Sequence, residues 1–270
     1  ASAVIGALRK AGRPAASIIV VEPFEAQREK LALAFGVAAQ AAADARLAQA
    51  ATVVWAVKPQ LFAEAAAPCR AHVAGALQLS VMAGIRTDAI ARATAGTGAD
   101  VEAPDAATGI VRAMPNTPAL IGRGIAGLFA TPAVDAAGRA RIEALLAPTG
   151  ATLWVAREAD LDAVTAVSGS GPAYVFYVLE AMIAAAEQMG LSAAQGRQLA
   201  LATFDGAAEL ARRSSETPQA LRAQVTSKGG TTHAAITSLE ADGVGAAFVK
   251  ALRAAERRAQ ELGDEFGRAG

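Results

Sequence analysis

Short β-branched runs alternate with helical segments through the first half of the chain, and this alternation constrains the fold more than any other feature. Continuous apolar runs bounded by turn residues predict buried strands at 17–21, 52–57, 76–81 and 109–113. Helical patterns separate or precede them at 1–11, 25–35, 61–73 and 87–93. Strands that alternate with helices of this length indicate an α/β fold with a doubly wound, Rossmann-type parallel sheet.

The strand signal disappears after about Leu153, and the rest of the sequence has helical periodicity. We expect helices at 160–167, 172–189, 193–212, 218–225, 231–242 and 245–262. We therefore predict a dinucleotide-binding α/β domain at 1–156, followed by an all-α C-terminal domain at 157–270. The stretch at 94–108, rich in Gly, Ala and Asp, is expected to be a surface loop.

The composition argues against several classes of function. Lys plus Arg and Asp plus Glu both total 25, so the formal net charge is zero. This balance argues against a nucleic-acid or membrane partner held by bulk electrostatics. One cysteine, Cys69, excludes an intramolecular disulfide and a cysteine-rich metal site, and two widely separated histidines argue against a zinc centre, so we expect no metal. No charged region precedes an apolar stretch at the start, so we expect no secretory signal and a cytoplasmic location.

The segment 172–189 is apolar over most of its helical circumference. Glu180 and Glu187 interrupt it near one face. Inside a bilayer each of these acids would cost about 2.5–3.5 kcal/mol. We therefore expect a helix buried in the core or in a subunit interface, rather than a membrane span.

Candidate ligand-binding residues follow the predicted strands, because ligands of open α/β sheets bind beyond the carboxyl ends of strands. Glu22 lies where an acidic residue takes the ribose hydroxyls of NAD, although it could equally be a solvated residue after a strand. Lys58, within AVKPQ at 56–60, is placed to meet a cofactor or is a solvated charge. Asn116 lies between two prolines, which present its amide rigidly or form a structural turn.

The motif Ser168-Gly169-Ser170-Gly171-Pro172 leads into the apolar helix and fits the G-x-S-x-G pattern of hydrolases. In that pattern Ser170 would be a nucleophile on a strand-to-helix turn. The preceding segment is helical, and no Asp followed by His occurs in a suitable context. We therefore reject a hydrolase.

The stretch TSKGGTTH at 226–233 is the most informative in the chain. Gly229 and Gly230 allow backbone amides to converge where Thr231 begins a helix, and free amides there form an anion site suited to a carboxylate. Thr232 adds a neutral hydroxyl. A plain capping loop is the alternative, and His233 by itself fits a structural role better than that of a catalytic base.

A doubly wound sheet normally opens with a strand, a glycine-rich turn and a helix. The sequence begins directly with the helix at 1–11. One explanation is that the first strand and its glycine-rich turn, about ten residues, are missing from the sequence ahead of this helix. The other is that the fold does not bind dinucleotides. The remaining motifs of this half favour the first explanation.

Taken together, the motifs resemble those of pyrroline-5-carboxylate reductases, the enzymes of the last step of proline synthesis. The matching segments occur in the order of the family and span nearly the whole chain: AVKPQ at 56–60, SVMAGI at 80–85, VRAMPNTPALIGRG at 111–124, DAVTAVSGSGPAYVF at 162–176 and VTSKGGTTHAAI at 225–236. The sequence departs from the family pattern at its start, where the glycine-rich turn is absent, and at 94–108, which is longer than usual.

The resemblance implies NADPH- or NADH-dependent reduction of 1-pyrroline-5-carboxylate to L-proline. A protonated cyclic imine already accepts hydride readily, so holding it against the nicotinamide is most of the task. By analogy the substrate site comprises Ser170, Ser227, Gly229, Gly230, Thr231 and Thr232, with the Thr232 hydroxyl as the catalytic group beside the ring nitrogen. The cofactor site comprises Glu22, Ala56, Val57, Lys58, Pro59, Ala83, Gly84 and Asn116.

The resemblance also implies that the helical domain forms a homodimer or larger homo-oligomer, in which each active site takes its substrate loop from the partner. One alternative is another two-domain NAD(P)-dependent reductase of the β-hydroxyacid dehydrogenase type. It requires a catalytic lysine on the helix after the domain boundary, and 172–189 contains none. The others are a non-catalytic nucleotide-binding protein and a purely structural helical dimer.

Overall fold

The structure, a computed structural model, describes residues 1–95 and 109–268. Most of the loop expected at 94–108 therefore lies outside the described residues. The chain divides into two compact units, one formed by Ala1–Ser170 with Ala255–Gly270 and the other by Gly171–Ala254. The functional boundary expected near residue 156 stays a prediction.

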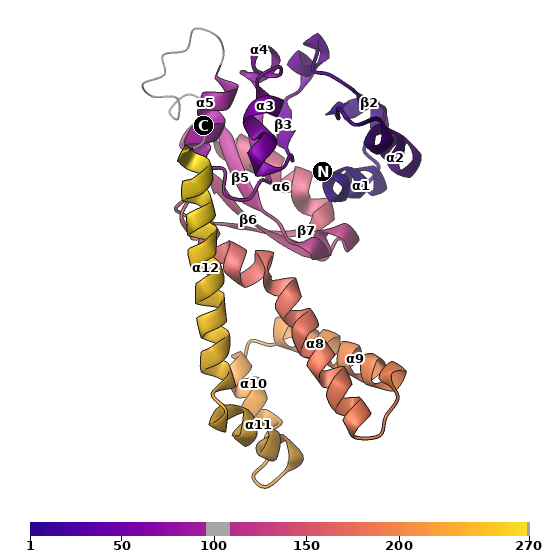
Figure 1. The fold of residues 1–270 in the computed structure, drawn as a ribbon, viewed down its shortest axis with the longest axis vertical. Helices are drawn as coiled ribbons and strands as arrows, with labels where there is room; N and C mark the ends of the chain where they lie inside the picture. Colours follow the sequence, from indigo (N-terminus) through magenta and orange to yellow (C-terminus); the bar gives the residue numbers. More distant parts are fainter. Residues whose placement is uncertain (96–108, 269–270) are drawn as a thin grey trace. The chain divides into compact units, whose positions relative to one another are not determined.

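The first unit is built on a five-stranded sheet (Figure 1). Its strands follow one another in space as in sequence: β3 (Thr52–Trp55), β4 (Leu77–Ser80), β5 (Ile110–Met114), β6 (Gly124–Ala130) and β7 (Gly150–Trp154). Neighbours are parallel except β5 and β6, which run antiparallel with Val111 opposite Ala130. A separate parallel pair joins β1 (Val20–Val21) to β2 (Ala39–Gln40).

Alternating side chains of the strands feed cores on both faces of this sheet, as the two-residue period of a strand requires. On β5, Ile110 packs with Trp55 in one core and Val111 packs with Leu79 in the other. The first core also receives α3 (Phe62–Ala66), α4 (Arg70–Val73) and α5 (Thr87–Thr94), and the second receives α6 (Ala136–Leu146). Helices on both faces confirm the doubly wound architecture.

Helices α1 (Ser2–Lys10) and α2 (Glu25–Phe35) form a smaller cluster with the β1–β2 pair. Its buried members are Ile5, Leu31 and Val37. The predicted helices at 1–11 and 25–35 are thus confirmed.

Several predicted elements differ in extent from those observed. The strand expected at 17–21 keeps only Val20–Val21, because Ala15–Ser17 forms a 3₁₀ turn. The helix expected at 61–73 is broken between α3 and α4. Strand β6 runs antiparallel to β5 because the connection between them, residues 115–123, is too short to contain the crossover helix that a parallel neighbour needs.

The second unit is entirely helical in its described residues. It contains α8 (Gly171–Gln188), α9 (Ala193–Arg213), α10 (Pro218–Gln224), α11 (Thr231–Ala241) and the first part of α12 (Val244–Arg268). The helices expected there are confirmed to within a few residues, apart from the longer C-terminal end of α12. None of the described helices has both the length and the apolarity needed to cross a membrane.

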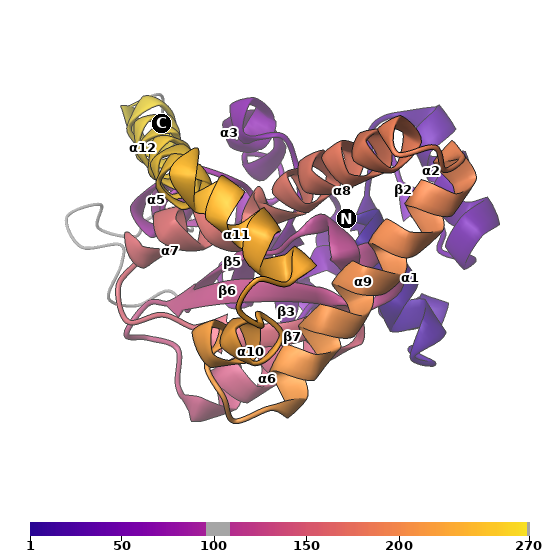
Figure 2. The same cartoon turned by 90° about the horizontal axis from the view of Figure 1, so that it is seen from below.

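Helices α8 and α9 are in contact, and they diverge from the connection that joins them (Figure 2). They approach closely at Gly196, where a Cβ atom would lie 2.9 Å from the Cβ of Ala186. The ring of Tyr174 on α8 meets that of Phe248 on α12 edge to face, with centroids 5.9 Å apart. A Ser192–Gln195 capping box begins α9.

Candidate active site

The predicted cofactor residues follow the carboxyl ends of strands in the first unit. Ala56–Pro59 follow β3, Ala83 and Gly84 follow β4, and Asn116 follows β5. These three strands are parallel neighbours, so their carboxyl ends meet at one edge of the sheet. Glu22 follows β1 of the smaller sheet. Within AVKPQ, Lys58 is exposed and Val57 packs against the core.

The tip of β1 holds both a carboxylate and a guanidinium. Oε1 of Glu22 accepts a hydrogen bond from the amide of Phe24 at 3.0 Å. Arg28, on α2, reaches back so that Nη1 donates to the carbonyl oxygens of Glu22 at 3.0 Å and Pro23 at 2.7 Å. A carboxylate at this position suits a ribose hydroxyl, whereas a guanidinium suits a 2′-phosphate.

The loop after β4 presents Ala83 between two buried anchors. Met82 and Ile85 are buried in the core, while Ala83 is exposed. Gly84 adopts φ +76°, a left-handed conformation that favours glycine. The amide of Met82 donates to the Ser80 hydroxyl at 3.3 Å. The loop therefore offers a fixed backbone and a small side chain to a ligand at the edge of the sheet.

The structure shows one of the two roles that the sequence left open for Asn116, and its cofactor role stays a prediction. Its Oδ1 accepts a hydrogen bond at 3.0 Å from the amide of Ile125 on β6. The carboxamide oxygen thus holds the turn, while the amide nitrogen keeps its two donors for a ligand.

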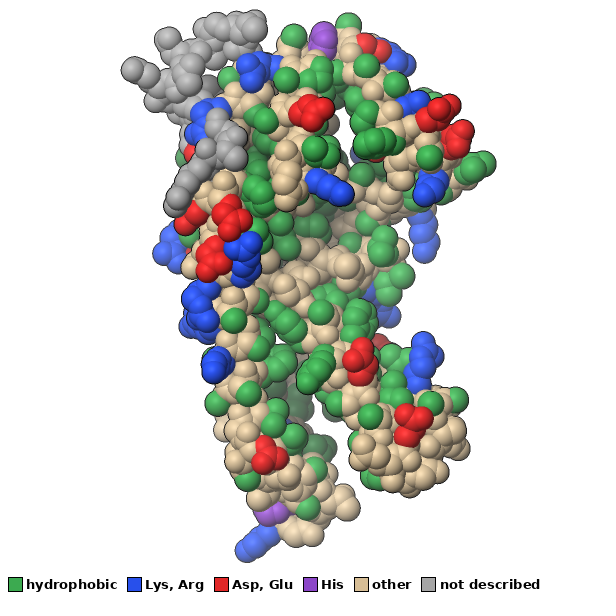
Figure 3. Space-filling view, in the orientation of Figure 1, with side chains coloured by type: hydrophobic (Ala, Val, Ile, Leu, Met, Phe, Trp, Pro, Cys, Tyr) green, Lys and Arg blue, Asp and Glu red, His purple; other side chains and the backbone are tan. Residues whose placement is uncertain are grey.

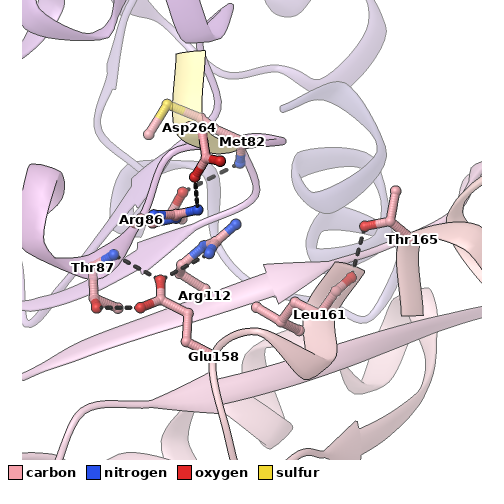
Figure 4. Close-up of polar contacts among 9 residues, drawn as sticks. Met82, Arg86, Thr87, Arg112, Glu158, Leu161, Thr165 and Asp264 are labelled. Carbon is pink, nitrogen blue, oxygen red and sulfur yellow. Dashed lines mark hydrogen bonds and ion pairs between the residues drawn. The ribbon is translucent and has the colours of Figure 1, made fainter. Parts of the chain in front are cut away.

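A buried polar cluster, which the sequence did not predict, supports this edge of the sheet (Figure 4). Glu158 accepts hydrogen bonds from Nη1 of Arg112 on β5, at 2.8 Å, and from the amide and hydroxyl of Thr87 on α5, at 2.8 and 2.7 Å. The side chains of Arg112 and Glu158 are only 10% and 24% exposed. A single arginine within the apolar run IVRAM was the signal available, because arginine is almost never buried without a partner.

A cavity of about 30 Å³, large enough for one water molecule, adjoins the cluster and the β4 loop. Its lining includes Ala83, Gly84, Arg112 and Asp162. Nε of Arg112 is buried with no partner among the described residues. Burial raises the pKa of the Asp162 carboxyl above its ordinary value, and the charges of Arg112 and Arg86 oppose part of that rise.

The predicted substrate loop lies in the second unit, between α10 and α11. The amide of Gly230 donates to the carbonyl of Ser227 at 3.0 Å, and Gly229 adopts φ +76°. A Cβ atom on Gly230 would lie 2.8 Å from the Ser227 hydroxyl oxygen, so only glycine fits this turn without movement. No side chain caps the start of α11 at Thr231. Its first amides are therefore free to hold an anion.

Thr232 lies in the first turn of α11 and is half-buried. Its hydroxyl makes no hydrogen bond to any residue that the structure describes, which gives no support to the helix-cap alternative. Ser170 belongs to the first unit, where its amide donates to the Thr165 carbonyl at 2.8 Å. The preceding residues, α7 (Asp160–Val164) and a π-helix (Thr165–Gly169), are helical and so lack the strand that a hydrolase elbow requires.

Two family descriptions match different parts of the chain. Residues 158–262 match the family described as pyrroline-5-carboxylate reductase dimerisation, and residues 1–84 match that described as NADP oxidoreductase, coenzyme F420-dependent. The pyrroline-5-carboxylate reductase of Pseudomonas aeruginosa is 42% identical, over 99% of this chain and 94% of that protein. That of Haemophilus influenzae is 39% identical, over 97% and 93%.

A solved structure of a pyrroline-5-carboxylate reductase from Coxiella burnetii is similar with a TM-score of 0.85 at 34% identity. The similarity covers 96% of this chain and 93% of that one. Sequence identity of this size over nearly the full length of both proteins, together with the matching fold, shows that the chain belongs to the pyrroline-5-carboxylate reductase family.

Proposed function

We propose that this protein reduces 1-pyrroline-5-carboxylate to L-proline with a hydride from NADPH or NADH, the last step of proline biosynthesis. One observation supports the substrate assignment above all. Within a chain of this family, α11 begins without a side-chain cap, and the half-buried Thr232 hydroxyl beside it has no partner among the described residues. This arrangement can hold a carboxylate together with an adjacent N–H group.

The chemistry needs positioning more than it needs a strong acid or base. A bound NADPH or NADH would supply the hydride, which adds to the carbon of the protonated C=N bond while the π electrons of that bond become the lone pair of the secondary amine. The free amides of Thr231 and Thr232 hold the substrate carboxylate, together with Ser170 and Ser227. The Thr232 hydroxyl oxygen accepts a hydrogen bond from the ring N–H, which keeps the imine charged and oriented.

The residues at the sheet edge fit a dinucleotide. Ala56–Pro59, Ala83 with Gly84, and Asn116 would line the cofactor. Ala83 is exposed, and the hydrogen bond from Ile125 uses only the amide oxygen of Asn116, so its amide nitrogen remains available. Glu22 binds the ribose of the adenosine half. The match of residues 1–84 to an NADP oxidoreductase family supports this assignment.

The second unit supports a homodimer or a larger homo-oligomer. Consecutive side chains of α8 are exposed in the single chain, with Phe176 at 58% and Tyr177 at 74%. A run of exposed apolar side chains of this kind is typical of a subunit interface. The family that matches residues 158–262 is described as pyrroline-5-carboxylate reductase dimerisation. In the assembly each active site takes its loop at Ser227–Thr232 from the partner.

We further assign the dinucleotide-binding role to residues 1–156 and the substrate-binding and dimerisation roles to 157–270. The enzyme works in the cytoplasm on a small-molecule substrate, without a nucleic-acid or membrane partner. The zero net charge supports the absence of a nucleic-acid or anionic-membrane partner.

The test is the decrease in absorbance at 340 nm when the full-length protein is mixed with NADPH or NADH and pyrroline-5-carboxylate. We expect oxidation of one cofactor per L-proline formed. A reductase of the β-hydroxyacid dehydrogenase type would instead oxidise the cofactor only with an oxo acid, and a non-catalytic protein would bind it without turnover. Either result would overturn the proposal.

A further inference from the structure

The last turns of α12 pack directly on the loop that follows β4. Although α12 begins in the second unit, its residues from Ala255 onward belong to the first. A Cβ atom on Gly84 would lie 2.7 Å from the ring of Phe266 and 3.3 Å from the backbone carbon of Leu262. Phe266 also packs against the core cluster that contains Met82 and Ile85. The C-terminal helix thus packs on the loop at Gly84.

A polar contact holds the same two segments together. Arg86, at the end of the loop, forms an ion pair with Asp264 on α12 (Figure 4). Gly263 lies against this guanidinium, since a Cβ atom there would be 3.3 Å from Nη2 of Arg86. Ala259 and Leu262 form part of the wall of the small cavity that Ala83 and Gly84 also line. The loop after β4 therefore contacts α12 through both the apolar ring of Phe266 and the Arg86–Asp264 ion pair.

We propose that Phe266 and Asp264 are positioning residues, which hold Ala83 and Gly84 in the conformation that binds the nicotinamide cofactor. This inference rests on the proposed cofactor role of Ala83 and Gly84. Glycine at φ +76° is free to adopt other conformations once nothing covers it. The Phe266 ring occupies the space beside Gly84, and Asp264 fixes the far end of the loop through Arg86. Neither side chain needs to touch the cofactor to affect its binding.

The remaining surface of this end of α12 provides a matched control. Charged side chains of both signs gather there (Figure 3). Glu265, next to Asp264, pairs with Arg258 on the same helix and is 55% exposed. Glu265→Gln therefore removes an ion pair of α12 that does not involve the β4 loop.

The experiment compares steady-state kinetics of Phe266→Leu, Asp264→Asn and Glu265→Gln in the full-length enzyme. We expect the KM for the cofactor to rise about three- to tenfold in the first two variants, because small displacements of a binding group weaken binding strongly. Values of kcat at saturating cofactor, and of KM for the imine, should stay within about twofold of the wild type. Glu265→Gln should behave as the wild type.

An unchanged cofactor KM in both Phe266→Leu and Asp264→Asn would overturn the proposal, as would an equal rise in Glu265→Gln. The double variant Arg86→Gln with Asp264→Asn should raise the cofactor KM no more than the stronger of the two single variants does. Additive increases would show that the Arg86–Asp264 ion pair does not act as a unit.

Hydrogen exchange of the wild-type enzyme distinguishes a failure of the positioning role from a failure of the proposed reductase function. NADPH should slow exchange of the amides at 82–86. If turnover occurs without that protection, the cofactor role of Ala83 and Gly84 is wrong and the positioning role fails with it, while the reductase assignment stands. If the loop is protected but the α12 variants keep their cofactor KM, only the positioning role fails.

Discussion

Thr232 carries most of the proposed substrate chemistry, because its hydroxyl is half-buried and has no partner in the described part of the chain. We predict that Thr232→Val lowers kcat by roughly ten- to 150-fold. This range corresponds to a hydrogen bond to a charged group, worth about 1.5–3 kcal/mol when it is fully made in the transition state. Valine keeps the shape of the side chain, so the fold and the cofactor affinity should not change. Steady-state kinetics and a melting curve check both statements.

Thr237→Val, an exposed position on the same helix, is the matched control and should keep full activity. If Thr232 instead capped the helix, its loss would cost about 1 kcal/mol of stability and little activity. A variant that melts earlier but turns over normally would remove Thr232 from the catalytic site.

Glu22 determines the expected choice between cofactors. A carboxylate about 4 Å from a 2′-phosphate repels each unit charge by about 1 kcal/mol in water and about 4 kcal/mol at an effective dielectric constant of 20. We therefore predict a preference for NADH. Arg28 should reduce this preference, because its guanidinium donates a hydrogen bond to the Glu22 carbonyl oxygen and so places a positive charge near the same position.

Kinetics with both cofactors checks the prediction. Glu22→Gln should shift the ratio of kcat/KM toward NADPH, and Arg28→Gln should shift it toward NADH. A clear preference of the native enzyme for NADPH would mean that the Glu22 carboxylate does not face the ribose.

At the scale of elements, α7 carries two aspartates whose pKa values move in opposite directions. Burial raises the pKa of Asp162, so its ionisation in the folded state opposes folding as the pH rises through that pKa, and this penalty is absent below the unfolded value. We predict that Asp162→Asn raises the Tm at pH 8, and that the gain shrinks toward pH 4.

Hydrogen bonds from Arg157 lower the pKa of Asp160, so Asp160→Asn should lower the Tm slightly at pH 8 and not at low pH. Equal shifts of the Tm at both pH values would contradict this account.

The elements that the sequence predicted well are those with a strong local period. The helices of residues 171–254 follow from their periodicity and from cap residues such as Ser192 and Thr217. Strand β6 was missed because GIAGLFA contains small residues instead of a β-branched run. Its antiparallel direction depends on the short connection from β5, which a local pattern does not encode.

The same limit applies to the site. The glycines and threonines of the proposed substrate loop could be recognised in the sequence because their chemistry is local. The pair Arg112–Glu158 spans 46 residues and the pair Arg86–Asp264 spans 178, so only the folded chain brings their members together. The hydrogen bond between the Asn116 side chain and Ile125 of β6 is likewise a contact that only the folded chain forms.

At the scale of the whole molecule, the exposed apolar run of α8 predicts self-association. We expect light scattering of the full-length protein at micromolar concentration to give a dimer or a larger assembly. Tyr177→Glu should dissociate it and abolish activity, because a charge in an apolar interface is strongly unfavourable. Leu33→Glu, at a position that is 89% exposed on α2, is the matched control and should change neither property. A fully active monomer would contradict the shared active site.

In the proposed reaction a hydride passes from the nicotinamide to the imine carbon of 1-pyrroline-5-carboxylate. The direct measurement uses NADPH or NADH deuterated at the transferred position of C4, with the L-proline product examined by mass spectrometry and NMR. We expect one deuterium per proline, bonded to the carbon that was part of the C=N bond. Proline without the label, or no proline while the cofactor binds, would contradict it.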